Sequence, residues 1–352
     1  MTIYLTTCII SMLFIGFLSR FRRKESKLQF ALVVLISALP CILVAGLRYG
    51  IGSDYFTYES YFMTGLGTKD PLYFSVLNSL VQFFGGDFAA SVFIVSALIF
   101  LLTYTRILED SPYPWLSVFL LFGMTFFFAS LNAMRQFLAI AILLYSIKCL
   151  ERNQNIRFFI LVAIASGIHL SSIIFCALYI LHKMDLDTRL FVILTPVIFG
   201  GIYLLRNNLG MITSAVNAYS NFIVNNATSG GSLIIQGLWQ LALILVGGFV
   251  YKNSTDRLKQ NKFRIYFDTQ LLALWEYALV SVINPNEIMR IIWIFAYPGI
   301  IFTPMVIRRL PSKLLKIAAI SVVVLGFGIF WIYAIGLNNS HEVLPYRSIF
   351  DV

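Results

Sequence analysis

Four arginines stand in short polar stretches of a chain that is otherwise strongly apolar. Arg48, Arg135, Arg290 and Arg347 each have amide, hydroxyl or aromatic side chains close by, and Gln136 directly follows Arg135. A guanidinium binds phosphate oxygens through a planar fork and keeps its charge near lipid. The four stretches therefore indicate phosphate binding, although each arginine taken alone is equally typical of a cation that reaches out of a membrane.

The stretch Leu47–Tyr58 has the greatest variety of such groups. It combines one cation, one carboxylate and three tyrosines within a few residues. A tyrosine offers a flat apolar face to a sugar ring and a hydroxyl for hydrogen bonding. We expect this stretch to contact a sugar or a phosphate through Arg48, Tyr49, Asp54, Tyr55 and Tyr58.

Three side chains are candidates for a general base. A carboxylate or a histidine can take the proton of an attacking hydroxyl, and His169, Asp54 and Glu287 are the available groups. His169 ranks first because histidine exchanges a proton near neutral pH. A hydrogen bond from His169 to a neighbouring serine is the structural alternative. Glu287 lies three residues before Arg290, so an ion pair within one helix is its alternative.

The composition indicates a membrane protein. Hydrophobic residues make up 59% of the 352 residues and charged residues 12%, whereas a soluble domain carries about 25% charged residues. We expect an all-α polytopic membrane protein that forms a single domain over residues 1–352, with about 12 transmembrane or re-entrant helices. The expected segments are 2–19, 28–47, 88–107, 114–130, 133–150, 157–168, 170–181, 190–205, 232–251, 266–283, 288–306 and 314–336.

The positive charges give an orientation. Short loops rich in Lys and Arg face the cytoplasm, which predicts that 20–27, 148–157 and 252–264 are cytoplasmic. The loops 48–87 and 206–231, and both chain ends, then face outward. The net charge of +10 is accounted for by this asymmetry and does not argue for nucleic acid.

Two apolar segments cannot each be assigned to one membrane-spanning helix. Residues 71–84 are expected to lie as an outward interfacial helix, and 156–183 to form two short helices or a re-entrant hairpin that turns near Gly167 and His169. One long helix over 156–183 is the alternative, but it would place a cationic loop outside. The expected interfacial helix at 71–84 carries one polar stripe, formed by Ser75, Asn78, Ser79 and Gln82.

Metal and nucleotide chemistry lack their motifs. The four cysteines show no CxxC spacing, and the three histidines are scattered. The chain has neither a phosphate-binding loop of the GxxxxGK type nor a G-x-S-x-G turn. We expect no metal and no cofactor.

Four motifs in order give a resemblance to a known family. RYGIGSDYFTYESYF, LNAMRQFLAIAILL, LVAIASGIHLSSII and NEIMRI lie within residues 40–300. In this order they resemble the EpsG family, which comprises Wzy-type polymerases of O-antigen and other bacterial polysaccharides. The resemblance carries over to its RQ, HxSS and ExxR pieces, which here are Arg135, Gln136, His169, Glu287 and Arg290.

The resemblance also implies a reaction and a place. Such enzymes transfer a growing glycan from one undecaprenyl diphosphate carrier to the sugar of a new lipid-linked repeat unit. They are multi-pass proteins of the bacterial inner (plasma) membrane, with the active site at its periplasmic or outer face. The implied partners are undecaprenyl-diphosphate-linked glycans, the lipid bilayer, and a chain-length regulator and flippase of the same pathway.

Three other functions remain open from the sequence. A flippase or transporter of lipid-linked glycans would use similar arginines, and Glu276, in the middle of an apolar segment, would suit a proton relay. However, no internal repeat of the kind found in transporters is visible. An O-antigen ligase would use a similar donor. A structural subunit of the export machinery would have no chemistry to lose when the arginines are changed.

Overall fold

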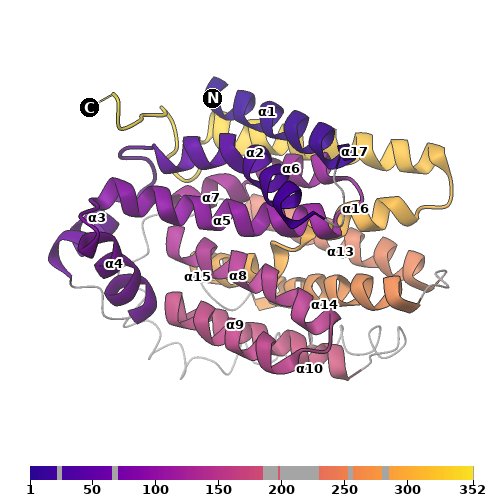
Figure 1. Ribbon diagram of the computed structural model, residues 1–352. Coiled ribbons are helices and arrows are strands. Elements are labelled where there is room, and N and C mark those ends of the chain that lie inside the picture. The colour runs from indigo at the N-terminus through magenta and orange to yellow at the C-terminus, as the bar shows by residue number, and fades with distance from the viewer. Residues whose placement is uncertain are drawn as a thin grey trace. The chain divides into compact units, whose positions relative to one another are not determined.

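The computed structural model describes residues 1–21, 26–65, 70–184, 197–198, 230–252, 257–279 and 285–351. Within these ranges all regular secondary structure is helical, apart from one isolated antiparallel bridge between Arg48 and Ser348 (Figure 1). The all-α class is therefore confirmed. Most of the expected outward loop 206–231 lies outside the described residues.

The contacts divide the chain into two compact units. Unit 1 comprises Met1–Ile173 together with Ile300–Val352, and unit 2 comprises Ile174–Gly299. The expectation of a single membrane domain stays a prediction. The two units are described separately below.

Unit 1 contains most of the helices, several of which have a side-chain cap. Ser26, Asp87 and Ser312 each accept a hydrogen bond from the backbone N–H three residues later, which satisfies one free donor of the helix start. The helices are α1 (Thr2–Leu18), α2 (Lys27–Gly46), α3 (Tyr55–Thr64), α4 (Asn78–Phe83), α5 (Phe88–Asp110), α6 (Pro114–Gly123), α7 (Phe126–Asn132), α8 (Met134–Glu151), α9 (Asn155–Ile168), α16 (Gly299–Arg309) and α17 (Lys313–Trp331).

The helices of unit 1 pack in a chain of neighbours. α2 lies between α1 and α5, and α8 lies between α5 and α9. Small residues allow the close approaches: a Cβ at Gly46 of α2 would come within 2.7 Å of the Phe93 ring on α5. The ends of these helices, rather than their middles, carry the polar side chains considered below.

Fewer helices than expected are long enough to cross a membrane. Four described helices meet the length and composition of a span, and the number rises to five if the bent pair α6 and α7 is one span. The two helices of that pair meet at 55°, because Met124 and Thr125 interrupt the helix and Thr125 adopts a left-handed φ of 63°. Other apolar helices, such as α1 and α9, are shorter. The count of about 12 spans is not confirmed.

The two segments that did not fit simple crossings are helical at the expected positions. A π-helical turn, Leu72–Leu77, continues into α4 and covers the predicted interfacial helix. Part of its polar stripe faces the protein, because Asn78 is buried and accepts a hydrogen bond from Ser91. The break near His169 is also present: α9 ends at Ile168, and a short 3-10 helix, Leu170–Phe175, follows.

Unit 2 contains α10 (Cys176–Lys183), α13 (Gly230–Lys252), α14 (Arg257–Leu279) and α15 (Pro285–Ala296). Its buried polar groups are mostly paired. Gln240 Nε2 donates to the Gln270 backbone oxygen at 2.8 Å, and the Gln270 amide donates to the oxygen of Phe295 at 2.9 Å. His182 lies 3.2 Å from the Asp268 carboxylate.

Candidate active site

The sequence singles out the polar segments around Arg48, Arg135, His169, Arg290 and Arg347, and unit 1 contains four of these five. The loop after α2, the junction of α7 and α8, the end of α9 and the C-terminal tail contact one another through the bonds given below. The fifth segment, at the start of α15, belongs to unit 2. In Figure 1, α3 and α4 lie at the end of unit 1 where α5 starts. The grouping thus arises because several helices end or begin at one end of this unit.

Arg48 is part of the framework. Its side chain is only 1% exposed. The guanidinium donates to the backbone oxygen of Ala45 and, at 3.0 Å, to that of Leu131, and it lies 3.4 Å from the Ser96 hydroxyl. These contacts tie α2 to α5 and α7, so Arg48 is not positioned to reach a phosphate. Its predicted role in substrate binding stays a prediction.

Asn132 fixes the loop that follows Arg48. Its Oδ1 accepts hydrogen bonds from the Asp54 N–H at 3.0 Å and from the Ser53 hydroxyl at 3.1 Å. Gly52 allows this approach: it has a φ of +93°, and a Cβ there would lie 3.2 Å from the Leu131 oxygen. The same contacts leave Asp54 half-buried at the start of α3.

Arg135 is the centre of the candidate site. It lies in the first turn of α8, and its side chain is 20% exposed. Nη1 donates to Asp70 Oδ2, and Nε donates to the Tyr58 hydroxyl at 3.3 Å. The guanidinium carbon lies 4.7 Å from the centroid of Phe74 and 5.4 Å from that of Tyr58. The aromatic rings and the carboxylate hold the fork in one orientation while one edge stays accessible.

Asp70 connects Arg135 to the end of α9. Its Oδ1 accepts the N–H of Leu170 at 3.1 Å, and its Oδ2 lies 3.9 Å from His169 Nδ1. This Nδ1 is buried and makes no hydrogen bond among the described residues. Asp70, Arg135 and His169 therefore form one group, which we call the α8-start cluster.

The charge of Asp70 is secured by its surroundings. Burial raises the pKa of its carboxyl, but the adjacent His169 ring and the Arg135 charge outweigh that effect. The Leu170 N–H acts in the same direction, and the pKa lies below its usual range. Asp70 is therefore an anion at neutral pH.

Sequence reasoning missed Asp70. It stands directly before Pro71, at the start of the segment 71–84, where an acidic residue reads as an ordinary helix start. The sequence offered one indication: Asp70 lies in the same expected outward loop, 48–87, as Asp54 and Tyr58.

The three tyrosines of Leu47–Tyr58 have different environments. Tyr58 contributes to the α8-start cluster through Arg135. Tyr55 is 2% exposed and packs edge-on against Tyr49 and Phe88 at 5.8 and 5.2 Å. Burial raises the pKa of Tyr55 to about 12, so its hydroxyl stays neutral. Tyr49 faces a separate cavity beside the C-terminal tail.

The remaining predicted residues are not part of the α8-start cluster. Gln136 is 2% exposed on α8. Arg290 is exposed on α15, and Glu287 lies in the first turn of that helix, in unit 2. Arg347 is exposed in the tail and lines the cavity beside Tyr49. The roles of these residues stay predictions.

The described residues contain no group of three or more His, Cys, Asp or Glu side chains arranged to hold a metal ion. In the α8-start cluster, the Arg135 guanidinium can bind an anion, and the neighbouring His169 and Asp70 side chains can accept a proton.

These features define a class: a helical membrane protein with a partly exposed arginine–aspartate–histidine group at the ends of its helices. The family model of the EpsG family matches residues 31–348, and the chain belongs to the EpsG family. Membership supports a membrane polysaccharide polymerase-like function. No curated protein and no solved structure gives a significant match.

Proposed function

We propose that this protein is a Wzy-type polysaccharide polymerase, a membrane glycosyltransferase that elongates a glycan carried on undecaprenyl diphosphate. It transfers the growing chain to the acceptor sugar of a new lipid-linked repeat unit, which builds O-antigen or another surface polysaccharide. The observation that carries the proposal is the α8-start cluster, within a chain of the EpsG family.

Arg135 suits the diphosphate of the donor. Its Nε and Nη1 donate to Tyr58 and Asp70, which leaves the Nη2 edge of the fork for phosphate oxygens. Its place in the first turn of α8 adds the unpaired N–H groups and the positive dipole end of that helix. A fixed arginine near a leaving diphosphate stabilises the negative charge that develops there.

His169 suits the acceptor side of the reaction. The acceptor hydroxyl oxygen forms a bond to the anomeric carbon of the growing chain, and the bond from that carbon to the diphosphate oxygen breaks. The diphosphate leaves with the electron pair, beside Arg135. With Nδ1 directed toward Asp70, Nε2 of His169 is left to accept the proton of the hydroxyl. Asp70 is a positioning residue for both Arg135 and His169.

The proposed setting follows from the charge distribution. With 20–27 and 252–264 cytoplasmic, the α8-start cluster faces the periplasmic or outer leaflet of the bacterial plasma membrane. Arg290 and Glu287 of unit 2 are proposed to assist binding of the second lipid-linked unit. A chain-length regulator and a flippase of the same pathway are the proposed protein partners.

The decisive experiment uses the full-length protein in lipid nanodiscs with lipid-linked repeat units from its own host. A ladder of undecaprenyl-linked products of increasing length is the expected result. Asp70→Asn, which removes the carboxylate but keeps the side-chain size, should lose the ladder. Wild-type protein that moves units across a bilayer without making a ladder would contradict the proposal and favour a flippase. Transfer of units to lipid A core alone would favour a ligase.

A further inference from the structure

The C-terminal tail folds back onto the loop after α2 and is held there by several bonds. The N–H of Tyr49 donates to the Arg347 oxygen at 3.0 Å, and the N–H of Ile349 donates to the Leu47 oxygen at 2.9 Å. The N–H of Gly52 donates to the Glu342 oxygen at 3.2 Å. The tail is therefore an ordered wall beside this loop.

Side chains outside the loop fix the tail as well. The Tyr4 hydroxyl of α1 donates to the Val343 oxygen at 2.8 Å. The Tyr346 hydroxyl donates to the Val44 oxygen of α2 at 3.0 Å. Asn339 closes the turn by accepting the N–H groups of Val343 and Leu344. Attachments to two helices make this part of the tail a structural element of unit 1.

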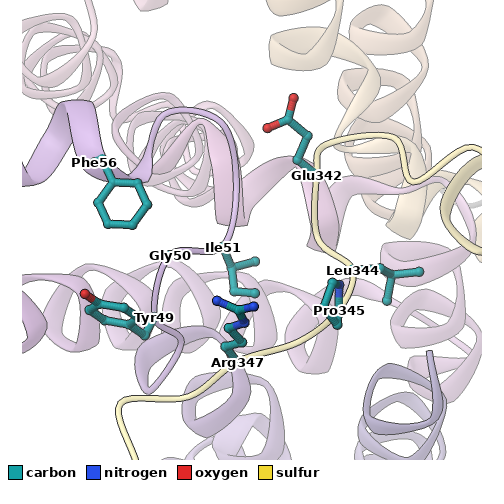
Figure 2. Close-up of a pocket in the computed structure, with 8 residues that line it drawn as sticks. All are labelled: Tyr49, Gly50, Ile51, Phe56, Glu342, Leu344, Pro345 and Arg347. Atoms are coloured by element: carbon teal, nitrogen blue, oxygen red, sulfur yellow. The ribbon is translucent and has the colours of Figure 1, made fainter. Parts of the chain in front are cut away.

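A cavity of about 170 Å³ lies between the tail and the loop. Its lining includes the rings of Tyr49 and Phe56, the charged side chains of Glu342 and Arg347, and the apolar side chain of Leu344. In Figure 2 the Arg347 guanidinium is directed toward the Gly50–Ile51 backbone. One wall thus comes from the loop and the other from the tail.

The two charged side chains of the cavity are available to a ligand. Neither the Arg347 guanidinium nor the Glu342 carboxylate makes a hydrogen bond or an ion pair with another described side chain. Asp351, the charge nearest to Arg347 in sequence, has its carboxylate bonded to the Ser348 N–H and hydroxyl. Both charged groups are exposed.

We propose that this cavity, which we call the tail pocket, is a subsite for one uncharged sugar ring of the glycan. The proposal rests on the proposed function, because it names a part of the same substrate. It assigns Tyr49, Phe56, Glu342 and Arg347 to sugar recognition and leaves the diphosphate to Arg135.

Three properties of the tail pocket fit a single ring. Its volume is below the roughly 300–1,000 Å³ of pockets for drug-sized molecules. Tyr49 and Phe56 meet edge-on, with centroids 6.2 Å apart, which makes an apolar corner for the C–H face of a sugar. Arg347 can donate to a sugar hydroxyl, while in Figure 2 the Glu342 carboxylate is directed away from the Arg347 guanidinium.

We assign the pocket to a sugar ring because its aromatic corner suits the C–H face of a sugar, and because the proposed function leaves the diphosphate to Arg135. Glu342 adopts a left-handed φ of 54°, which is unusual for glutamate. Glycine or asparagine would adopt that backbone more easily, and neither supplies a carboxylate at this place.

Saturation-transfer NMR on the full-length protein in nanodiscs tests the tail pocket directly. The probes are the methyl glycosides of glucose, galactose and N-acetylglucosamine, with glucose 1-phosphate as the charged comparison. At least one neutral glycoside should show saturation transfer that weakens in Tyr49→Ala, whereas any signal from glucose 1-phosphate, whose phosphate Arg135 can bind, should not change in Tyr49→Ala. Tyr49→Ala and Arg347→Gln should each weaken binding about tenfold. Arg152→Gln, at an exposed arginine after α8, is the matched control and should bind as the wild type does.

Folding is checked with Tyr49→Phe, which keeps the ring and should retain most of the signal. Absence of saturation transfer from all neutral glycosides to the wild type would overturn the proposal, as would equal signals in Tyr49→Ala, Arg347→Gln and Arg152→Gln. A glucose 1-phosphate signal that falls in Tyr49→Ala as much as the methyl glucoside signal does would also overturn it. A glycoside signal that depends on Tyr49, from a protein that makes no polymer ladder, would support the tail pocket and contradict the polymerase.

Discussion

A cluster of charged side chains lies at each end of α8, and the two clusters differ in how deeply their arginine is buried. At its C-terminal end, Arg106 of α5 contacts Glu109 at 2.6 Å, Asp110, and Glu151 of α8 at 3.6 Å, and Lys148 of α8 contacts Glu109. We call these five residues the α8-end cluster. Arg106 is 1% exposed, and the Asp110 side chain is fully buried.

The α8-start cluster differs in how fully its charges are paired. Arg135 keeps 20% of its side chain exposed, and His169 Nδ1 has no hydrogen bond among the described residues. In the α8-end cluster Arg106 is buried among three carboxylates, and Lys148, although also 20% exposed, is paired with Glu109 away from any partly exposed histidine. The comparison teaches that charge near the end of a membrane helix is not by itself a sign of function. Incomplete pairing next to aromatic rings is the more informative feature.

The largest expected effect is on stability at the α8-end cluster. Arg106→Met should lower the free energy of unfolding by about 3–5 kcal/mol, because it leaves the buried Asp110 carboxylate without its partner. Unfolding of the protein by denaturant or heat in detergent measures the change. Arg152→Met, at an exposed arginine, should change it by less than about 0.5 kcal/mol. If both variants are equally stable, the α8-end cluster is not the structural element described here.

Next comes the effect of Arg135 on activity. Arg135→Lys keeps the charge but loses the fork, and polymer formation should fall about 10²- to 10³-fold. The ladder assay on membranes with matched protein levels measures this. Stability should change little compared with Arg106→Met, and Arg152→Lys serves as the matched control. A normal ladder from Arg135→Lys would remove Arg135 from diphosphate binding.

Local patterns in the sequence predicted the all-helical membrane class, the helix at 71–84 and the break after Ile168. Arg135 was also indicated, because an arginine that opens an apolar helix is visible within a few residues of sequence. These features depend on composition and short spacing. The count of about 12 spans is not confirmed, because among the described residues apolar runs such as those of α1 and α9 form helices shorter than a full span.

Long-range contacts could not be predicted in the same way. Asp70 joins the candidate site only because it meets Arg135 of α8 and Leu170 after α9, which lie 65 and 100 residues further along the chain. Arg48 is an arginine in a polar stretch of the sequence, as Arg135 is, but close packing of α2, α5 and α7 buries it. The hydrogen bonds between the tail and Leu47–Gly52 likewise join segments that lie far apart in the sequence.

The third prediction concerns His169. His169→Gln should lower polymer formation about 10²-fold near neutral pH, because the base is lost. Ladder formation by the wild type and the variant, followed between pH 5 and pH 8, measures the loss and compares their pH profiles. A stable His169→Gln variant with the wild-type rate and pH profile would shift the assignment to Asp54 or Glu287.

Asp70 does not contribute to the pH dependence of ladder formation that is compared in the His169→Gln experiment. Its pKa lies below the usual range, so the stability that its charge contributes is fully present above its unfolded-state pKa of about 3.9. That contribution is lost only as the pH falls through the still lower pKa of the folded state. Changes between pH 5 and pH 8 therefore do not arise from Asp70.

The smallest expected effect comes from Gly52, which positions the loop beside the α8-start cluster. Gly52→Ala should cost about 1–2 kcal/mol of stability for its left-handed backbone, as any L-residue does there. It should also lower activity, because the new Cβ would lie 3.2 Å from the Leu131 oxygen and from Asn132 Cα, next to Arg135. Gly65→Ala is the matched control: Gly65 has a φ of +68°, with no atom within 4 Å of the added Cβ. Thermal unfolding and the ladder assay on both variants separate the two effects. A loss of activity in Gly65→Ala as large as in Gly52→Ala would mean that backbone strain alone, and not the approach to Asn132, is responsible.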